Sequence, residues 1–211
     1  MSDFLFNQAV VASELKQFFS TEKAKLNSFG STVNQTFEAY TFAASIKWYK
    51  KHGWDVRIIN PIIGRQEVFK LKFNTRGAPK NYSYVECSRD GESCQIRHNL
   101  RVSTAAHHAQ NERPANICCD VAIISVENFD GYSTDEALPN DELISFGEVK
   151  HMSAYAELVA GFIGLVHELQ PKRLRRVRIG SRTPGHHIAP FLNISGLLQR
   201  TAQGLVETVK R

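Results

Sequence analysis

The chain has 211 residues, of which 42% are apolar and 22% are charged, so it can build one substantial core. No stretch of about 18 apolar residues is present and the first residues lack a signal-peptide pattern, so we expect neither a membrane span nor a leader. The formal net charge of +5 is compatible with a polyanionic partner but does not identify one. Four cysteines in apolar surroundings favour free thiols and a cytoplasmic protein.

Apolar residues at helical spacing predict two helices in the first quarter of the chain, over residues 3–27 and 34–53. Thr32 and Gln35 are spaced as in a capping box, which supports the start of the second helix. The residues expected on the packed face of that helix are Phe37, Tyr40, Ala44 and Trp48.

Beyond residue 53 the apolar pattern changes to a period of two, which indicates strands. Arg89 to Glu92 contains Asp-Gly and predicts a tight hairpin turn. The expected strands are residues 54–60, 67–73, 82–87, 93–102, 117–126, 142–150 and 173–180. A helix over 153–170, apolar nearly all round, should be buried against the sheet, with Gly161 and Gly164 allowing close approach. Residues 188–196 stay undecided, and a last helix is expected over 195–210.

This order predicts an α/β (α+β) protein with a central mixed sheet flanked by helices. We expect a single domain over 1–211, with a core at about 34–180, an N-terminal helical extension over 1–30 and a C-terminal loop and helix over 181–211.

Three charged residues interrupt strands that are otherwise built for burial. Asp120 lies within one apolar strand, and Glu148 and Lys150 lie on one face near the end of the next, with Ile144 and Phe146 expected on the same face. If the two strands pair in antiparallel fashion, both carboxylates and the lysine converge. Two carboxylates suit Mg²⁺, and a neighbouring lysine can position a water and stabilise phosphate charge.

Asp120 followed by Glu148-Val149-Lys150 resembles the signature of the PD-(D/E)xK nuclease superfamily, the restriction-endonuclease-like fold. That family's core is a helix, three antiparallel strands, a helix and a strand, with the Asp on the second strand and the Glu-x-Lys on the third. Cys119 stands where the family usually has proline. The resemblance implies a deoxyribonuclease that uses Mg²⁺ or Mn²⁺ held by Asp120 and Glu148, with Lys150 positioning the attacking water. Glu38 matches a metal-supporting glutamate on the first core helix.

DNA is the partner that the resemblance implies, and a homodimer is plausible. Five residues are candidates for contacting it: Arg97, His98, Arg101, His151 and Arg182.

Two other functions stay open. The fold could serve as an inactive module that binds nucleic acid or protein, and Cys87, Cys94 and His98 could hold a structural zinc ion. Each residue also has an ordinary interpretation: Asp120 as a structural aspartate bonded to backbone amides, Glu148 and Lys150 as a weak ion pair, and Glu38 as a solvated helix residue.

Overall fold

The structure is a computed structural model that describes residues 32–105, 115–125, 137–174 and 186–209. The chain forms two compact parts, Met1–Thr36 and Phe37–Arg211. In the first part the described residues, 32–36, are helical. The helix predicted over residues 3–27 lies outside the described residues. The sheet and the helices that position the candidate site belong to the second part.

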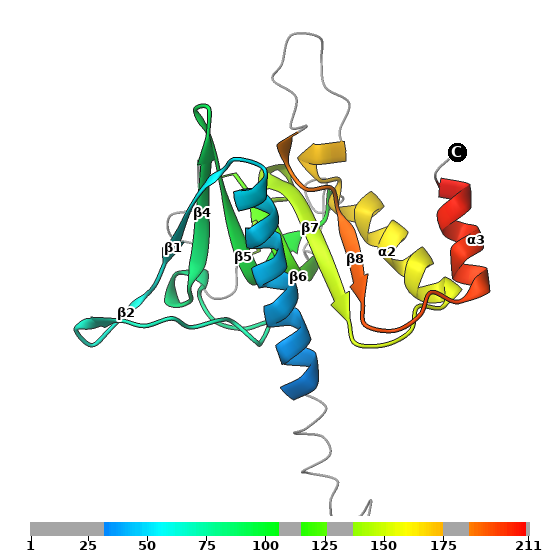
Figure 1. Ribbon diagram of the computed structural model, residues 1–211, viewed down its shortest axis with the longest axis horizontal. Coiled ribbons are helices and arrows are strands. Elements are labelled where there is room, and N and C mark those ends of the chain that lie inside the picture. Colours follow the sequence, from blue (N-terminus) through cyan, green and yellow to red (C-terminus); the bar gives the residue numbers. More distant parts are fainter. Residues whose placement is uncertain (1–31, 106–114, 126–136, 175–185, 210–211) are drawn as a thin grey trace, which may run out of the picture. The chain divides into compact units, whose positions relative to one another are not determined.

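Residues 32–51 are helical, close to the predicted 34–53, and Gly53 follows with a positive φ of 79°. The remaining elements follow one another as predicted in broad outline (Figure 1). In chain order they are β1 (Asp55–Ile59), β2 (Ile62–Ile63), β3 (Gln66–Glu67), η1 (Pro79–Asn81), β4 (Tyr84–Arg89), β5 (Glu92–Ser103), β6 (Asn116–Ile124), η3 (Asn140–Glu142), β7 (Leu143–Lys150), α2 (Ala156–Leu169), η4 (Lys172–Leu174), β8 (Phe191–Ile194) and α3 (Arg200–Val209).

The main sheet is mixed, which confirms the predicted α/β class. Its six strands lie in the order β1-β4-β5-β6-β7-β8. All neighbouring strands are antiparallel except β7 and β8, which are parallel and are connected through α2. The turn between β4 and β5 has Asp90 at φ 50° and Gly91 at φ 80°. Two successive positive φ angles are typical of the type I′ turn, so the predicted hairpin is confirmed.

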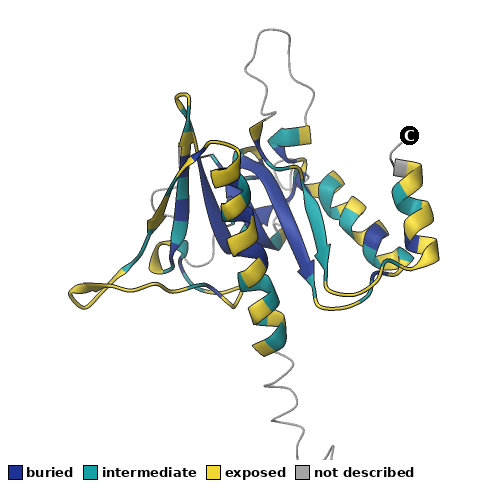
Figure 2. Ribbon diagram, in the orientation of Figure 1, coloured by how far each residue is buried: buried dark blue, intermediate teal, exposed yellow. Residues whose placement is uncertain are grey.

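Helices cover both faces of the sheet, and the central strands are the most buried part of this portion of the chain (Figure 2). On one face, Phe42 and Tyr49 of the helical residues 37–51 pack with Ile96 and Val121. On the other face α2 packs through Leu169 and its neighbours. A third cluster joins α2 to α3. The candidate site lies at the middle of β6 and the C-terminal end of β7.

The predicted packed face of the first described helix is only partly right: Trp48 packs against the core, but two of the other residues do not. Tyr40 is 66% exposed and Ala44 is exposed, and the buried positions are instead Thr41, Phe42, Ser45 and Tyr49. Thr41 and Ser45 can be buried because each hydroxyl group donates a hydrogen bond to the backbone carbonyl four residues earlier, at 2.9 Å for Thr41 and 3.0 Å for Ser45. The aromatic residues lie on several sides of this helix, so their spacing alone could not identify the packed side.

One predicted strand is wrong, and another lies mostly outside the described residues. Of residues 67–73, Glu67 alone is in a strand. Gly64 lies in the turn of the short β2–β3 hairpin, and the pairing of its two strands ends at Glu67. Of residues 173–180, the first two belong to the 3₁₀ turn η4, and 175–180 lie outside the described residues. Among the described residues, the strand that follows α2 in the sheet is β8, within the undecided segment 188–196.

The helix α2 is less buried than predicted. Val159 and Leu169 are its buried residues, while Ile163 is 37% exposed. The predicted close approach at Gly161 and Gly164 is wrong, because a Cβ at either position would meet no atom within 4 Å. A helix that packs against a sheet buries one stripe, whatever the composition of its other side. No helix in the described part of the chain has the length and apolar character needed to cross a membrane.

His187 is a buried titratable residue in the larger core. Its Nδ1 shares a 3.0 Å hydrogen bond with the Tyr49 hydroxyl, and its ring lies 4.9 Å from that of Trp54. Burial lowers the pKa of His187 from 6.5 to about 4, and the charges of His186 and Arg173 act in the same direction. The folded state therefore holds the neutral ring, whereas the unfolded state accepts a proton near pH 6.5.

The free energy of unfolding should fall as the pH drops from about 6.5 toward about 4, because protonation favours the unfolded state in that window. The titration of His187 alone should lower the free energy of unfolding by about 2 kcal/mol between about pH 7 and about pH 5. Urea denaturation of wild type and His187→Gln at both pH values measures the effect. The variant should lose less stability than wild type, and an equal loss in both proteins contradicts the assignment to His187.

Candidate functional site

The antiparallel pairing of β6 and β7 brings the three predicted strand residues together. Val121 pairs with Gly147, so the next residues along the strands are Asp120 and Glu148. The Lys150 Nζ lies 2.9 Å from Glu148 Oε2 and 3.4 Å from Asp120 Oδ2. The ammonium group therefore lies within ion-pair distance of both carboxylates, as the sequence pattern predicts if these strands pair.

Asp120 also binds the backbone of the neighbouring strand. The Val149 N–H donates to Asp120 Oδ2 at 2.7 Å. This bond is the structural role that a lone strand aspartate often has, and here it coexists with the ion pair. It ties the end of β7 to β6 and holds the Asp120 carboxylate in one orientation beside Lys150.

The expected common face of β7 is only partly present. Phe146 packs on the side of α2, but Ile144 packs in the cluster with the helix 37–51. The pairing of β6 with β7 shifts register at Ile123 and Ile124, and this irregularity turns Ile144 to the opposite face. Glu148 and Lys150 keep the alternation of Phe146, and both line a pocket of ≈ 240 Å³ beside α2.

Burial and crowding dominate the electrostatics of the cluster. Asp120 is 9% exposed and Glu148 is 7% exposed. Burial raises the pKa of Glu148, the Asp120 carboxylate raises it further, and Lys150 opposes both. Burial acts to lower the pKa of Lys150, but the carboxylates of Glu148 and Asp120 outweigh it, so the net shift is upward. The lysine is therefore charged at neutral pH, and a further cation beside the carboxylates would relieve their repulsion.

Glu38 reaches the same region from the helix. Its position falls on the buried side of that helix, at helical spacing from Thr41, Phe42 and Ser45. Burial raises the pKa of Glu38, and Asp120 contributes to the rise. Its Oε2 accepts a 3.2 Å hydrogen bond from Asn99 Nδ2 and lies 3.7 Å from His98 Nε2. The charge of Glu38 in turn contributes to the raised pKa of Glu148.

Asn99 is the residue of this cluster that the sequence did not single out. It has a φ of 51°, an unusual backbone conformation for a strand residue. Its Nδ2 donates both to Glu38 and to the Lys72 carbonyl, the latter at 2.9 Å. The Lys72 ammonium in turn donates to the Asn99 carbonyl at 2.7 Å. An asparagine within an apolar strand was the available signal, because it tolerates a left-handed backbone better than most residues.

The sheet is irregular at both Asn99 and Asp120, which face each other across β5 and β6. On β5, Ile96 packs toward the helix 37–51 but Leu100 packs toward α2. On β6, Val121 likewise packs toward the helix 37–51 and Cys119 toward α2. Regular alternation would put each of these pairs on one face. Because the side chains of β5 and β6 change from one face of the sheet to the other here, side chains from both layers can meet at this point. Such irregular strand pairing is common next to functional sites.

The predicted DNA-contacting residues lie in different surroundings. Arg97 is 5% exposed, stacks 3.9 Å from the Tyr84 ring and donates to Gln95. His98 is 4% exposed, and its Nδ1 bonds to the Lys72 carbonyl. The others are Arg101, which is half-buried at the end of β5, His151, which is exposed directly after β7 with its ring 6.0 Å from Phe37, and Arg182, which lies outside the described residues.

The donor set at Asp120 and Glu148 fits a hard cation. Carboxylate oxygens are the ligands that Mg²⁺ prefers, and Mg²⁺ usually keeps several waters and takes one or two carboxylates from the protein. Hydrogen bonds from the described residues end on Oδ2 of Asp120 and Oε2 of Glu148, which leaves Oδ1 and Oε1 for a ligand. Within the described ranges, no group of three or more His, Cys, Asp or Glu side chains is placed to hold a metal ion. This applies to Asp120, Glu148 and Glu38 taken together, and also to Cys87, Cys94 and His98.

The chemistry that the cluster can support follows from its charges. Two buried carboxylates and a protonated lysine provide cation ligands and a proton donor at one point, beside an open pocket. Comparison with known proteins adds nothing to this geometry: no family model, curated protein or solved structure matches the chain.

Proposed function

We propose that this chain is a metal-dependent endonuclease that hydrolyses phosphodiester bonds of DNA. The observation that carries the proposal is the convergence of Asp120, Glu148 and Lys150, with the ammonium 2.9 Å from one carboxylate and 3.4 Å from the other. Each residue is buried or half-buried on strands that otherwise hold apolar side chains. Burying three charges costs free energy that their mutual ion pairs offset only in part, so these residues favour a function over a contribution to stability.

The element order supports a restriction-endonuclease-like core. The antiparallel strands β5, β6 and β7 are followed by α2 and the parallel strand β8. Asp120 lies on the second of the three antiparallel strands, and Glu148 and Lys150 lie on the third. This is the arrangement expected of a PD-(D/E)xK nuclease.

Each residue of the cluster has a role in the proposed reaction. Asp120 and Glu148 would hold Mg²⁺, for which Mn²⁺ can substitute, and the metal would supply a Lewis acid for the scissile phosphate. Lys150 donates from Nζ to the attacking water or to a phosphate oxygen. Glu38, fixed by Asn99, is not placed as a third metal ligand, so its role would be to orient a metal-bound water.

A binding role without cleavage is the second candidate. It is favoured by the position of Lys150 Nζ, which forms ion pairs with both carboxylates and so neutralises charge that a metal ion would otherwise neutralise. Calorimetric titration with Mn²⁺ separates the two candidates. The nuclease proposal requires a binding site that disappears in Glu148→Gln, and the binding module requires none.

Cleavage of supercoiled plasmid and of a labelled oligonucleotide duplex tests the nuclease directly. We expect cleavage with Mg²⁺ or Mn²⁺, none with EDTA, and a loss of at least about 100-fold in Asp120→Asn, because a neutral amide holds a cation poorly. The matched control is Asp141→Asn, an exposed acid in η3, which should cleave like wild type. Metal-dependent cleavage that persists in Asp120→Asn refutes the proposal.

A further inference from the structure

An exposed arm projects from the sheet between β1 and β4. It comprises residues 61–82, including the β2–β3 hairpin (Figure 1). Residues 62–70 are all exposed, as are 73–76 (Figure 2). At its base, Ser83 N donates to the Lys70 carbonyl at 2.7 Å, and Ser83 Oγ donates to Asn60 at 2.9 Å. The arm therefore extends from a fixed base and contributes little to the core.

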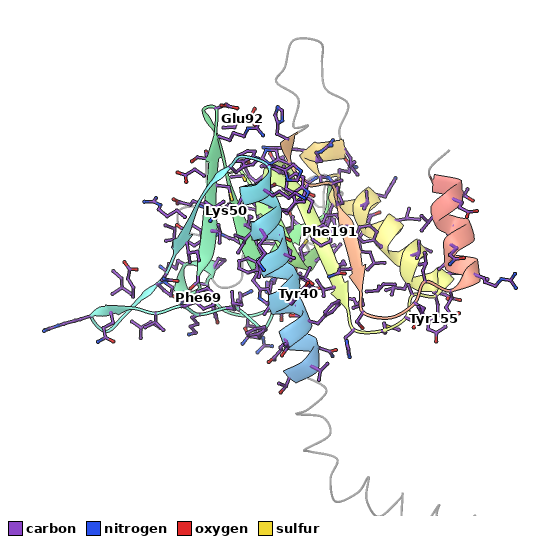
Figure 3. All side chains as sticks on the ribbon, in the orientation of Figure 1. Tyr40, Lys50, Phe69, Glu92, Tyr155 and Phe191 are labelled. Carbon is purple, nitrogen blue, oxygen red and sulfur yellow. The ribbon has the colours of Figure 1, made fainter. Side chains whose placement is uncertain are left out.

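The arm combines exposed apolar side chains with positive charge. Ile62 at its tip is 74% exposed, Ile63 is 48% exposed and Phe69, labelled in Figure 3, is 58% exposed. Four exposed basic residues accompany a single acidic one, Glu67; they are Arg65, Lys70, Arg76 and Lys80. Large exposed apolar side chains mark interaction sites. Protein interfaces are depleted in lysine, whereas nucleic-acid surfaces need cations for phosphates and apolar groups for the grooves.

The returning half of the arm is bonded to the candidate site. The Lys72 carbonyl accepts from Asn99 Nδ2, and the same Nδ2 donates to Glu38. Phe73 packs edge-on against the His98 ring, with centroids 5.0 Å apart. Lys72 is 3% exposed, and burial lowers its pKa; its ammonium is held by the Asn99 and Thr75 carbonyls. A polymer that lies along the arm would therefore pass close to Asn99 and Glu38, beside the carboxylate cluster.

We propose that the arm grips duplex DNA beside the cleavage site, with its basic residues on phosphates and Ile62 and Ile63 against the groove. This inference rests on the proposed function and names the substrate as a duplex. A two-stranded ribbon of this kind fits a DNA groove, and its apolar tip supplies contacts that phosphate binding alone does not.

Binding of a fluorescein-labelled duplex, followed by anisotropy in EDTA over a range of salt concentrations, tests the arm. The charge variant is Arg65→Gln/Lys70→Gln/Lys80→Gln. It should bind about tenfold or more weakly, and the negative slope of log K against log salt should become less steep by up to about 2.7, or about 0.9 for each phosphate contact. The charge-matched control, Lys47→Gln/Lys50→Gln/Lys51→Gln on the exposed side of the helix, should keep the wild-type slope.

The tip variant Ile62→Ser/Ile63→Ser separates the apolar contribution from the charges. It should weaken binding while leaving the salt slope unchanged, because the lost contacts release no counterions. Urea denaturation should match wild type in all variants, since the changed side chains are exposed.

The outcomes distinguish the arm from the nuclease. If wild type cleaves DNA and the arm variants bind it equally well, the arm proposal is overturned and the nuclease stands. If wild type neither binds nor cleaves DNA, both are overturned. If the tip variant converts a dimer to a monomer in light scattering without a change in DNA binding, the arm is an interface between copies of the chain, and this proposal is wrong.

Discussion

Lys150→Met is expected to lower the cleavage rate by about 100- to 10,000-fold, the range typical of losing a positioned proton donor. The variant keeps the length of the side chain and removes the charge that lies within ion-pair distance of Asp120 and Glu148. Single-turnover cleavage with saturating metal measures the chemical step. Lys47→Met, an exposed lysine on the helix, is the control and should retain the wild-type rate.

The same variant should also be less stable in the absence of metal, because it leaves two buried carboxylates without their cation. Removing one partner of a fully buried pair costs about 3–5 kcal/mol. Lys150 is 38% exposed, so solvent screening reduces the expected loss to about 1–2 kcal/mol. Added Mg²⁺ or Mn²⁺ should restore more stability to Lys150→Met than to wild type, since the metal no longer competes with the ammonium.

Two results would contradict this account of Lys150. A Lys150→Met protein that cleaves at the wild-type rate has no need of the ammonium in the reaction. A variant with lower stability that metal does not restore shows that the carboxylates do not hold a cation. Lys150→Arg keeps the positive charge in a bulkier planar group, so it should preserve stability while the cleavage rate still falls.

Gly147→Ala is expected to destabilise the protein by about 1–3 kcal/mol, the usual cost of overpacking a filled core. A Cβ at this position would lie 2.2 Å from Cζ of the Phe191 ring, well inside contact distance. Gly147 pairs with Phe191 where β8 docks along β7, and Glu148 pairs with Leu192 next to it. The close packing of these two strands therefore holds the end of β7 that carries the site.

Urea denaturation of the single and double variants measures this packing. Phe191→Val removes the obstructing ring, so Gly147→Ala should cost less in that background than in wild type. Gly164→Ala on α2 is the matched control; its Cβ would meet no atom within 4 Å, and it should stabilise the helix by about 0.5–1 kcal/mol. If Gly147→Ala costs the same in both backgrounds, the Phe191 ring is not the cause.

The residues of the candidate site differ in how far the sequence could predict them. Asp120, Glu148 and Lys150 are charges in strands that otherwise alternate or run apolar, so they stand out from their neighbours. Their convergence needed one further assumption, that the two strands are antiparallel neighbours, and the pairing of Val121 with Gly147 satisfies it. Asn99 could not be predicted in the same way, because its role depends on a positive φ and on bonds to Lys72 and Glu38, which are distant in sequence.

The sequence by itself determined the helical character of 34–51, of α2 and of α3, the strands β1 and β4 to β7, the β4–β5 turn at Asp90 and Gly91, and the charged residues that interrupt β6 and β7. These features follow from local periodicity and from backbone preferences, which a short stretch of chain carries within itself. The tertiary structure alone decided which face of the first described helix is buried, that β8 pairs with β7 in the sheet, and that residues 68–76 leave the sheet as part of an arm. Each of these depends on distant partners, since a helix face or a strand edge is buried only where another element covers it.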